Sequence, residues 1–420
     1  MPKFIIQGKA KIAGEISVGG AKNNAQIMIP ASLLSSKPML LHNVPKIDGV
    51  EKSIELMEDL GAKISYKNNS LEIDPKNINK SELEGKLADK FRTSVMYVGP
   101  LLARFKEVKF PHPGGCVIGA AGRPIDLFLE SFKKMGAEIA ISDRFYHIKA
   151  KKLKACKYFF STVSVTGTQS IMMTACLAEG TSTIYNCAME PEVVALANYL
   201  NSQGAKISGV GTSTLTIKGV KKLNNGEVDV IPDRIETGSF ALMAAALKAE
   251  LKIVNCNPSH LLSLLNIFEK IGVPFIKGKN YLIIKKASKI KALDLKTHEY
   301  PGFSTDLQSP YVVLMSQAYG KSLIQETIYD RRLIWTDMLS QMGADITMCD
   351  PHRIVVYGPN KLYGKKLISP DIRAGIALII AALIAEGQTE IDNIYQIDRG
   401  YESIETRLQG IGAKISRVEN

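Results

Sequence analysis

One glycine pattern recurs six times along this chain of 420 residues. In each copy a glycine precedes a short segment such as AKIS, AEIA or ADIT, and the glycines stand 68 to 75 residues apart: Gly61, Gly136, Gly204, Gly272, Gly343 and Gly412. Glycine suits the left-handed residue that ends a helix, and the β-branched segment after it suits a strand. The sequence therefore predicts a repeat protein of six α/β units, each longer than the repeats of common solenoids.

The repeats divide into two halves. The segments that begin at Phe4 and Leu215 run in parallel, with matching glycine-glutamate steps at Gly14 and Gly226, and three repeats follow each segment. The simplest architecture is two similar domains of three units, with the chain crossing between them at these segments. A double crossover of this kind would make a hinge with a cleft between the domains.

The composition is that of an ordinary globular protein, with 45% hydrophobic and 22% charged residues. The longest uncharged apolar run, 374–385, is shorter than the roughly 18 residues that a membrane span needs, so we expect a buried helix there and no membrane partner. The start of the chain lacks the apolar core of a secretory signal. Six scattered cysteines without a CxxC pair fit a reducing compartment, so we expect a cytoplasmic protein. The net charge of +12 fits either nucleic acid or a phosphate-rich small substrate.

Equivalent positions of the repeats carry a first set of candidate residues. Each of them stands where a strand is predicted to give way to a helix: Lys22, Arg92, Thr166, Arg234, Asp306 and Arg373. Free amide groups and the helix dipole make such junctions suitable for anions. Any single cation here could merely cap a loop, but a set in register around an array indicates anion binding.

A second set lies on the other connector of each repeat, 11 to 15 residues before the turn glycine: Lys46, Arg123, Glu192, Arg332 and Arg399. One of these connectors, 111–126, is long and glycine-rich, and it carries Cys116 with Arg123 nearby. A cation close to a mobile thiol favours the thiolate. Cys116 is therefore a candidate acid, nucleophile or lid residue, and an inert loop cysteine is the alternative reading.

The sequence lacks the motifs of several other chemistries. There is no P-loop, GxGxxG, GxSxG or HExxH motif, and the six histidines show no metal-ligand spacing. We therefore expect neither a metal site nor a cofactor.

At many of these positions the sequence resembles the UDP-N-acetylglucosamine 1-carboxyvinyltransferase family. The motifs that carry the resemblance follow one another along the whole chain: GGAKNNA around Lys22, PGGCVIG around Cys116, GRPIDL from Gly122, SVTGT from Ser164, PDRIETGSF from Pro232, FSTDLQ around Asp306, DIRAG around Arg373 and IDRGYE around Arg399. The resemblance implies an α/β fold with an inside-out α/β barrel like that of EPSP synthase in each of two domains, built from three β-α-β-α-β-β units. It places residues 21–230 in one domain with the Cys116 loop and residues 1–20 plus 231–420 in the other, with the active site in the cleft between them.

The same resemblance implies a reaction. Members of the family transfer the enolpyruvyl group of phosphoenolpyruvate to the 3-hydroxyl group of UDP-N-acetylglucosamine and release phosphate, through a tetrahedral ketal formed by addition and then elimination. This reaction is the first committed step of peptidoglycan precursor synthesis. Without a metal, the counter-charge for two anionic substrates has to come from the protein. We expect these small molecules as the partners, with no nucleic acid and no obligate protein partner.

The family's functional residues are carried over by motif. The expected catalytic residues are Cys116 as proton donor and covalent partner of phosphoenolpyruvate, Asp306 as general base, Lys22 and Arg399. The expected phosphoenolpyruvate-binding residues are Lys22, Asn23, Arg123, Arg332, Arg373 and Arg399. The expected sugar-nucleotide contacts are Arg92, Arg123, Pro124, Ile125, Asp126, Leu127, Ser164, Val165, Asp306 and the backbone at Ile328.

Two features of the sequence depart from the family pattern. The Cys116 loop is two residues longer before Arg123 than is usual, and Gln396 stands where many members have histidine. Two other readings also remain. The sister enzyme that acts on shikimate 3-phosphate shares the fold and the reaction, but the cysteine loop and the GAKN motif argue against it. A basic protein that binds or processes RNA would use the positive charge directly, but it would need basic strips with interleaved aromatic residues, and these make up only 7% of the chain.

Overall fold

All six predicted turn glycines adopt the left-handed backbone conformation that their pattern requires. In the computed structural model, which describes residues 2–83, 88, 92–112 and 125–419, their φ angles lie between 84° and 109°. Each of them ends a helical segment and leads into a strand, as the sequence predicts. A side chain at these positions would be strained, so glycine at the turns is a requirement of the backbone.

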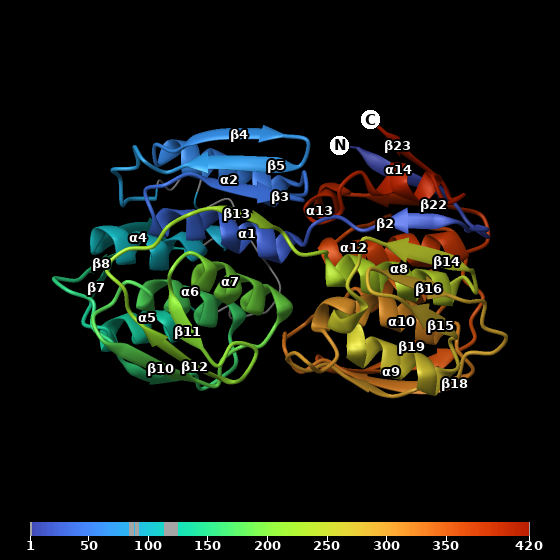
Figure 1. Ribbon diagram of the computed structural model, residues 1–420. Coiled ribbons are helices and arrows are strands. Elements are labelled where there is room, and N and C mark those ends of the chain that lie inside the picture. The colour runs from blue at the N-terminus through green and yellow to red at the C-terminus, as the bar shows by residue number, and fades with distance from the viewer. Residues whose placement is uncertain (1, 84–87, 89–91, 113–124, 420) are drawn as a thin grey trace. The chain divides into compact units, whose positions relative to one another are not determined.

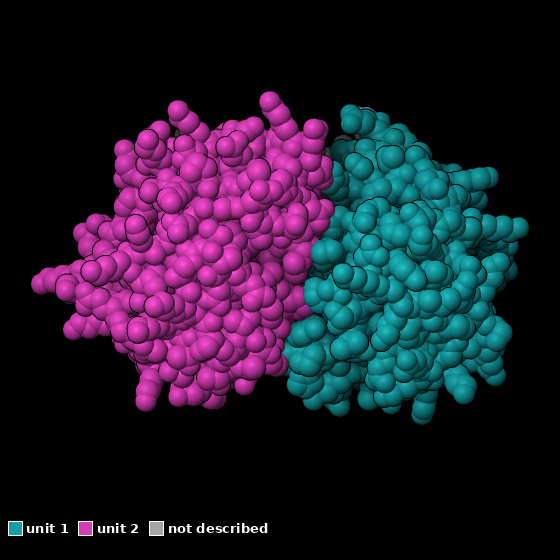
Figure 2. All heavy atoms as spheres, in the orientation of Figure 1, with its two compact units in different colours: residues 1–19, 118–120, 232–420 teal, residues 20–117, 121–231 magenta. Residues whose placement is uncertain are grey.

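The described residues group into two compact units. Unit 1 holds the chain up to Gly19 together with the chain from Pro232 onwards, and unit 2 holds the described residues between Gly20 and Ile231 (Figures 1 and 2). The chain thus passes from one unit to the other next to Gly19 and again next to Ile231.

Unit 2 contains the first half of the repeats. Its strands are β3 (Met39–His42), β4 (Lys63–Lys67), β5 (Ser70–Asp74), β6 (Glu107–Pro111), β7 (Glu138–Ile141), β8 (Phe145–Lys149), β9 (Lys157–Phe159), β10 (Thr181–Tyr185), β11 (Lys206–Ser208), β12 (Thr214–Lys218) and β13 (Glu227–Asp229). Its helices are α1 (Lys22–Ala31), η1 (Ser32–Leu34), α2 (Asp48–Asp59), η2 (Arg92–Tyr97), α4 (Val98–Phe105), α5 (Asp126–Lys134), α6 (Val165–Ala175) and α7 (Pro191–Ser202).

Unit 1 contains the second half of the repeats and the N-terminal strands. Its strands are β1 (Lys3–Gln7), β2 (Glu15–Ser17), β14 (Leu251–Val254), β15 (Phe275–Lys277), β16 (Tyr281–Ile284), β17 (Leu295–Lys296), β18 (Gly320–Gln325), β19 (Asp345–Asp350), β20 (Arg353–Gly358), β21 (Lys366–Ile368), β22 (Gln388–Asp392) and β23 (Lys414–Val418). Its helices are α8 (Arg234–Ala246), η3 (Pro258–Leu261), α9 (Leu262–Ile271), η4 (Thr305–Leu307), α10 (Gln308–Ser316), α11 (Thr336–Gln341), α12 (Ile372–Ile384), α13 (Tyr395–Asp398) and α14 (Ile404–Gln409).

The third repeat shows the common plan in its simplest form. It runs β9, α6, β10, α7, β11, β12, and its sheet has the order β11-β12-β10-β9. β9 and β10 are parallel, which requires a crossover such as α6 between them, and the other neighbours are antiparallel. This is the β-α-β-α-β-β unit that the sequence predicts.

In both units the helices lie inside and the sheets outside, as Figure 1 shows. Helices α8 and α10 are buried along their whole length, and so are eleven of the residues of α12, which confirms the buried helix expected over 374–385. Strands such as β10 alternate buried and exposed residues, because a sheet with one face on the core and one in water needs this alternation. Among the described residues, no helix is long and apolar enough to cross a membrane. The inside-out α/β architecture predicted from the sequence is confirmed.

The two units exchange one edge strand each. In the third repeat the strand before the central helix pairs with the strand after it, but in the first repeat β2 precedes α1 and pairs instead with β14 in unit 1. Reciprocally, β13 precedes α8 and pairs with β3 in unit 2. The N-terminal strand β1 belongs to the sheet of the sixth repeat, where it lies between β22 and β23 and is antiparallel to both. Unit 1 is therefore built from two separate stretches of chain, one at each end of the sequence.

Candidate functional site

The first set of candidate residues lies at helix starts, as expected. Lys22, Arg92 and Arg234 are the first residues of α1, η2 and α8. Thr166, Asp306 and Arg373 are the second residues of α6, η4 and α12. The register that was predicted from the spacing of the repeats is thus present in three dimensions, with amide groups of a helix start beside each side chain.

Unit 1 brings three of the predicted site residues into direct contact. One carboxylate oxygen of Asp306 accepts a hydrogen bond from Arg332 Nη2 at 2.8 Å, and the other accepts one from Arg373 Nη2 at 2.8 Å. The side chains of Arg332 and Arg373 are 2% and 6% exposed, whereas that of Asp306 is 23% exposed. We call these three residues the Asp306 cluster. Its carboxylate is the part that water reaches.

A layer of polar groups behind the cluster fixes Arg332. Its Nη1 donates to Thr305 Oγ1 at 3.1 Å, and Thr305 Oγ1 donates to the buried carboxylate of Glu326 at 2.8 Å. The other oxygen of Glu326 accepts the backbone N–H of Ile328 at 2.8 Å. The Ile328 backbone, expected at the sugar-nucleotide site, therefore belongs to the same hydrogen-bonded network as Arg332.

The electrostatics of the cluster keep both guanidinium groups charged. Burial is the largest single influence and lowers the pKa of Arg332 and Arg373. Asp306 and the other acidic groups near each arginine together raise the pKa by more, so that it lies above its ordinary value. Arg332 Nε is buried and has no acceptor among the described residues. An orphaned donor of this kind is costly, and an anion that entered the cluster would satisfy it.

Arg399 lies in the same unit but outside the cluster. It follows α13, and its Nη1 donates to Gln396 Oε1 at 2.9 Å. In the part of the chain that the structure describes, it makes no ion pair with Asp306. The contact with Gln396 shows that the residue which replaces the usual histidine holds this arginine in place.

The predicted residues of unit 2 lie at separate helix starts. Lys22 and the exposed Asn23 begin α1. Ser164 caps α6, where its Oγ accepts the N–H of Gly167 at 3.0 Å, and Val165 is the first residue of that helix.

The other expected contacts in unit 2 surround the start of α5. Ile125 is buried, Asp126 is exposed, and the carbonyl of Leu127 accepts the hydroxyl of Tyr158 at 2.6 Å. Cys116, Arg123 and Pro124 lie outside the described residues, as does the side chain of Arg92.

Sequence reasoning missed two groups of buried polar residues. One is the Thr305–Glu326 layer, for which no local pattern exists. The other is Glu236, which accepts the N–H of Gly19 at 2.9 Å and both Nη groups of Arg407. Asp233, followed three residues later by Glu236, has the spacing of a helix-capping box. Asp233 caps α8, as a capping box predicts. Glu236 instead accepts the N–H of Gly19, next to which the chain passes between the units, so the capping box predicts only one of the two contacts.

The described residues contain no group of histidine, cysteine or carboxylate side chains that could hold a metal ion. The chemistry that the described site can supply is therefore that of cations, one carboxylate and backbone amides. Such a set binds and polarises an anion and accepts a proton.

Comparisons with known sequences agree along the whole chain. The family profile described as EPSP synthase (3-phosphoshikimate 1-carboxyvinyltransferase) matches residues 6–408. A protein of Halothermothrix orenii named UDP-N-acetylglucosamine 1-carboxyvinyltransferase is 42% identical over 419 residues, covering 100% of this chain and 100% of its own. A protein of Desulfosudis oleivorans with the same name is 40% identical over 418 residues, with 100% of both chains covered.

Comparisons with solved structures concern the fold. The enolpyruvyl transferase NikO from Streptomyces tendae is similar with a TM-score of 0.89 and 21% identity, over 99% of both chains. EPSP synthase from Acinetobacter baumannii is similar with a TM-score of 0.76 and 17% identity, over 100% of both chains. Both have the architecture described above.

Proposed function

Because the chain belongs to the UDP-N-acetylglucosamine 1-carboxyvinyltransferase family of enolpyruvyl transferases, we propose that it transfers the enolpyruvyl group of phosphoenolpyruvate to the 3-hydroxyl group of UDP-N-acetylglucosamine. Phosphate is the second product. This reaction supplies a precursor of peptidoglycan. The full-length relatives at 42% and 40% identity carry the name of this enzyme, which favours it over the shikimate enzyme, whose solved structure is 17% identical.

The observation that carries the proposal is the Asp306 cluster. Two buried guanidinium groups face one carboxylate that water reaches, and one of them has a buried donor without a partner. Without substrate, Asp306 is the counter-ion of both arginines. Phosphoenolpyruvate carries a phosphate and a carboxylate, and either group can form the bidentate contacts that a guanidinium favours.

We infer that the substrate replaces Asp306 as a hydrogen-bond partner of Arg332 and Arg373. When an anionic group of phosphoenolpyruvate takes over N–H donors of Arg332 and Arg373, the carboxylate loses hydrogen bonds and gains free lone pairs. It then accepts the proton of the 3-hydroxyl group, whose oxygen forms a bond to C2 of phosphoenolpyruvate while a proton is added to C3. In the second step C3 loses a proton and the bond from C2 to the phosphate oxygen breaks.

Unit 2, together with Arg399 of unit 1, supplies the rest of the proposed site. Lys22 and Asn23 are proposed to bind phosphoenolpyruvate with Arg123 and Arg399, and Cys116 to deliver the proton to C3. Arg92, residues 123–127, Ser164 and Val165 are proposed to hold the sugar nucleotide, together with Asp306 and the backbone at Ile328. The support is the placement of the described members at helix starts, where amide groups favour phosphate. Residues of both units would thus act on one pair of substrates, in a cleft between residues 21–230 and residues 1–20 plus 231–420.

We place the reaction in the cytoplasm, with these small molecules as the only partners. The support is the chemistry of the substrates, since phosphoenolpyruvate is an intracellular metabolite, together with a cysteine content typical of reducing compartments. No membrane, nucleic acid or protein partner is needed for the chemistry described.

Phosphate release is the measurement that tests this function. Purified protein should release phosphate only when phosphoenolpyruvate and UDP-N-acetylglucosamine are both present, and a chelator should leave the rate unchanged. Equal release with shikimate 3-phosphate as the acceptor would overturn the assignment in favour of the sister enzyme. Salt-sensitive RNA binding without turnover would support the basic-protein reading instead.

A second experiment addresses the residues that the structure leaves undescribed. The epoxide antibiotic fosfomycin, which the cysteine of this family opens, should form an adduct on Cys116, and faster when the sugar nucleotide is present. Mass spectrometry locates the adduct. An active enzyme with no adduct, or with one on another cysteine, would show that the longer loop does not deliver the thiol to the site.

A further inference from the structure

One surface position recurs in the sheets of the repeats, so its residues can be compared from one repeat to the next. It is the second residue after the turn glycine, together with the residue opposite it on the neighbouring antiparallel strand. In four of the sheets these pairs are Lys63 with Asp74, Glu138 with Lys149, Asp345 with Tyr357, and Lys414 with Gln7. In the third repeat the pair is Lys206 with Lys218. Among the described residues this is the only one of these positions with two like charges opposite each other.

Two of the other sheets compensate a lysine near this position with an acidic residue. Lys149 of the second repeat lies 3.1 Å from Glu107, and Lys285 of the fourth lies 2.8 Å from Glu250. In the third repeat, the residue on the other side of Lys218 is Thr181. Neither Lys206 nor Lys218 forms an ion pair with any residue in the described part of the chain. The compensation used in two other repeats is therefore missing here.

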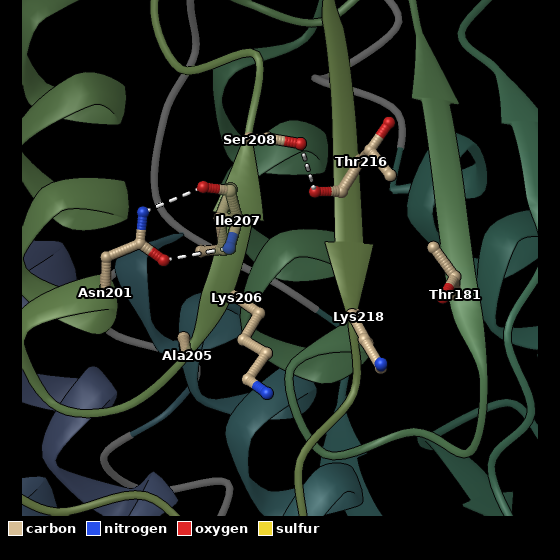
Figure 3. Close-up of a pocket in the computed structure, with 8 residues that line it drawn as sticks. All are labelled: Thr181, Asn201, Ala205, Lys206, Ile207, Ser208, Thr216 and Lys218. Carbon is tan, nitrogen blue, oxygen red and sulfur yellow. Dashed lines mark hydrogen bonds between the residues drawn. The ribbon is translucent and has the colours of Figure 1, made fainter.

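Like charges at directly opposed positions destabilise a sheet, because their Cβ atoms lie only about 4.5–5.5 Å apart. Figure 3 shows both lysine side chains extending from neighbouring strands toward the same end of a pocket. The side chains are exposed, so water and salt reduce the repulsion without removing it. A bound anion between the two ammonium groups would turn the repulsion into two attractions.

The lysine pair lies at an open hollow of the surface that also carries hydroxyl groups. The pocket has a volume of 570 Å³ and is lined by Thr181, Asn201, Ala205, Lys206, Ile207, Ser208, Thr216 and Lys218. Hydroxyl groups thus lie on the same face as the ammonium groups. The strand that carries Lys206 is held by Asn201, whose amide donates to the carbonyl of Ile207 and accepts its N–H, both at 2.8 Å (Figure 3).

We propose that the Lys206–Lys218 pair is a binding site for a phosphate dianion, either free phosphate or the terminal group of a small phosphate ester. Lysine is a compact point charge that binds phosphate well, and the hydroxyl group of Thr181 can donate to the phosphate oxygens. The site lies on the outer face of the third sheet, whereas the predicted sugar-nucleotide contacts of this repeat, Ser164 and Val165, lie at the start of α6. It is thus separate from the proposed substrate contacts and does not depend on them.

The signals of individual lysines provide a direct test. Reductive methylation with ¹³C keeps the positive charge and gives each lysine an NMR signal, which the variants Lys206→Arg, Lys218→Arg and Lys414→Arg assign. Phosphate is added at constant ionic strength, with chloride as the reference. We expect saturable shifts of the Lys206 and Lys218 signals and no saturable shift of Lys414, which lies opposite a neutral glutamine. Equal behaviour of all three signals would overturn the proposal.

The variant Lys218→Glu provides a second test, because it restores the opposite-charge pattern of the second repeat. In chloride the variant should unfold at a higher temperature than the unmodified protein. It should also lose at least tenfold in the affinity for phosphate read from the Lys206 signal. Lys206→Gln, with the affinity read from the Lys218 signal, serves the same purpose if the first variant folds poorly, and an unchanged affinity in either one would refute the site.

Two probes separate the possible sources of the phosphate group. Inorganic phosphate and glycerol 3-phosphate should both shift the two signals if any phosphate dianion is accepted, and a response to only one of them identifies the source. Phosphate is also a product of the proposed reaction, so it can bind elsewhere. Because the readout belongs to Lys206 and Lys218 themselves, failure of the proposed function would leave this result unaffected.

Discussion

Unit 1 and unit 2 carry their predicted site residues in different ways. In unit 1, Asp306, Arg332 and Arg373 are already joined by hydrogen bonds of 2.8 Å, and both guanidinium groups are buried. In unit 2, Lys22, Ser164 and Asp126 begin or cap three different helices. The two units thus differ in how their described site residues are arranged, since those of unit 1 are joined by ion pairs and those of unit 2 stand at the starts of separate helices.

The same contrast holds for the residues that form hydrogen bonds with the two segments where the chain passes between the units, next to Gly19 and next to Ile231. Two positions after Lys22, Asn24 accepts the N–H of Ile231 at 3.1 Å. Two positions after Arg234, Glu236 accepts the N–H of Gly19 at 2.9 Å, and its charge is balanced by Arg407. Equivalent positions thus fasten the two crossings, with a neutral amide in unit 2 and a buried ion pair in unit 1.

The largest effect is expected from Asp306→Asn. The variant keeps the shape of the cluster but cannot accept the hydroxyl proton, and a positioned base typically contributes a factor of roughly 10² to 10⁴ in rate. Turnover measured by phosphate release should fall by that factor, whereas sugar-nucleotide binding should remain. The exposed Asp345→Asn of the same unit is the matched control. A normal rate in the Asp306 variant would remove this residue from the mechanism.

Arg373→Gln and Lys22→Gln compare the two units directly. Removing Arg373 takes away one of the two guanidinium groups that bind the Asp306 carboxylate while Arg332 remains as its counter-ion, so the loss of folding stability should be about 1.5–3 kcal/mol, the value of a hydrogen bond to a charged group. Lys22 is only half-buried at a helix start, so its variant should lose affinity for phosphoenolpyruvate while denaturant unfolding changes little. Kinetics and unfolding of both proteins give the comparison. Similar losses of stability in the two variants would mean that unit 2 is organised like unit 1.

A smaller effect is expected from Asn24→Ala. The substitution removes the acceptor of the Ile231 N–H and should cost about 1–3 kcal/mol in unfolding free energy. Its neighbour Asn23 is exposed, so Asn23→Ala should change stability by less than about 0.5 kcal/mol and act on phosphoenolpyruvate binding instead. Reversed effects in this pair would show that the crossing segment is not fastened by Asn24.

The smallest effect concerns the buried thiols, for which the two units should be alike. Burial raises the pKa of Cys176 and Cys187 to about 12 and that of Cys256 to about 11. At pH 8 their thiolate fraction is therefore roughly one in a thousand or less, and it rises tenfold with each pH unit. A thiol reagent followed by mass spectrometry should leave these three unlabelled while the exposed Cys349 reacts. Fast labelling of Cys176 in unit 2 alone would reveal a looser core there.

Much of the fold could be predicted because its signals are local. A glycine that must adopt a positive φ, followed by a β-branched segment, marks a helix-to-strand turn wherever it occurs, and six such turns fix the repeat. The first candidate set could be found for the same reason, since the start of a helix is a local feature. The crossings at β2 and β13 could also be predicted, from the matching glycine-glutamate steps at Gly14 and Gly226, whereas the sheet that each strand joins is set by tertiary packing.

The contacts within the site could not be predicted in this way. Asp306 meets Arg332 and Arg373 across 26 and 67 residues of chain, and the pairing depends on which helix starts converge in the folded unit. Glu326 and Arg407 have no motif of their own and act by completing the hydrogen bonds of others. The residue types at a site can thus be predicted from the sequence, whereas the side chains that they contact are set by tertiary packing.

The placement of β1 between β22 and β23 has a consequence for synthesis on the ribosome. The first strand to emerge pairs with the last strands to be made, which end at Val418. At about 5–20 residues per second, a nascent chain would wait roughly 20 to 80 s before this sheet can close. Until then the emerging N-terminus presents an unpaired strand to every neighbouring nascent chain, and a chaperone that shields it would protect the whole of unit 1.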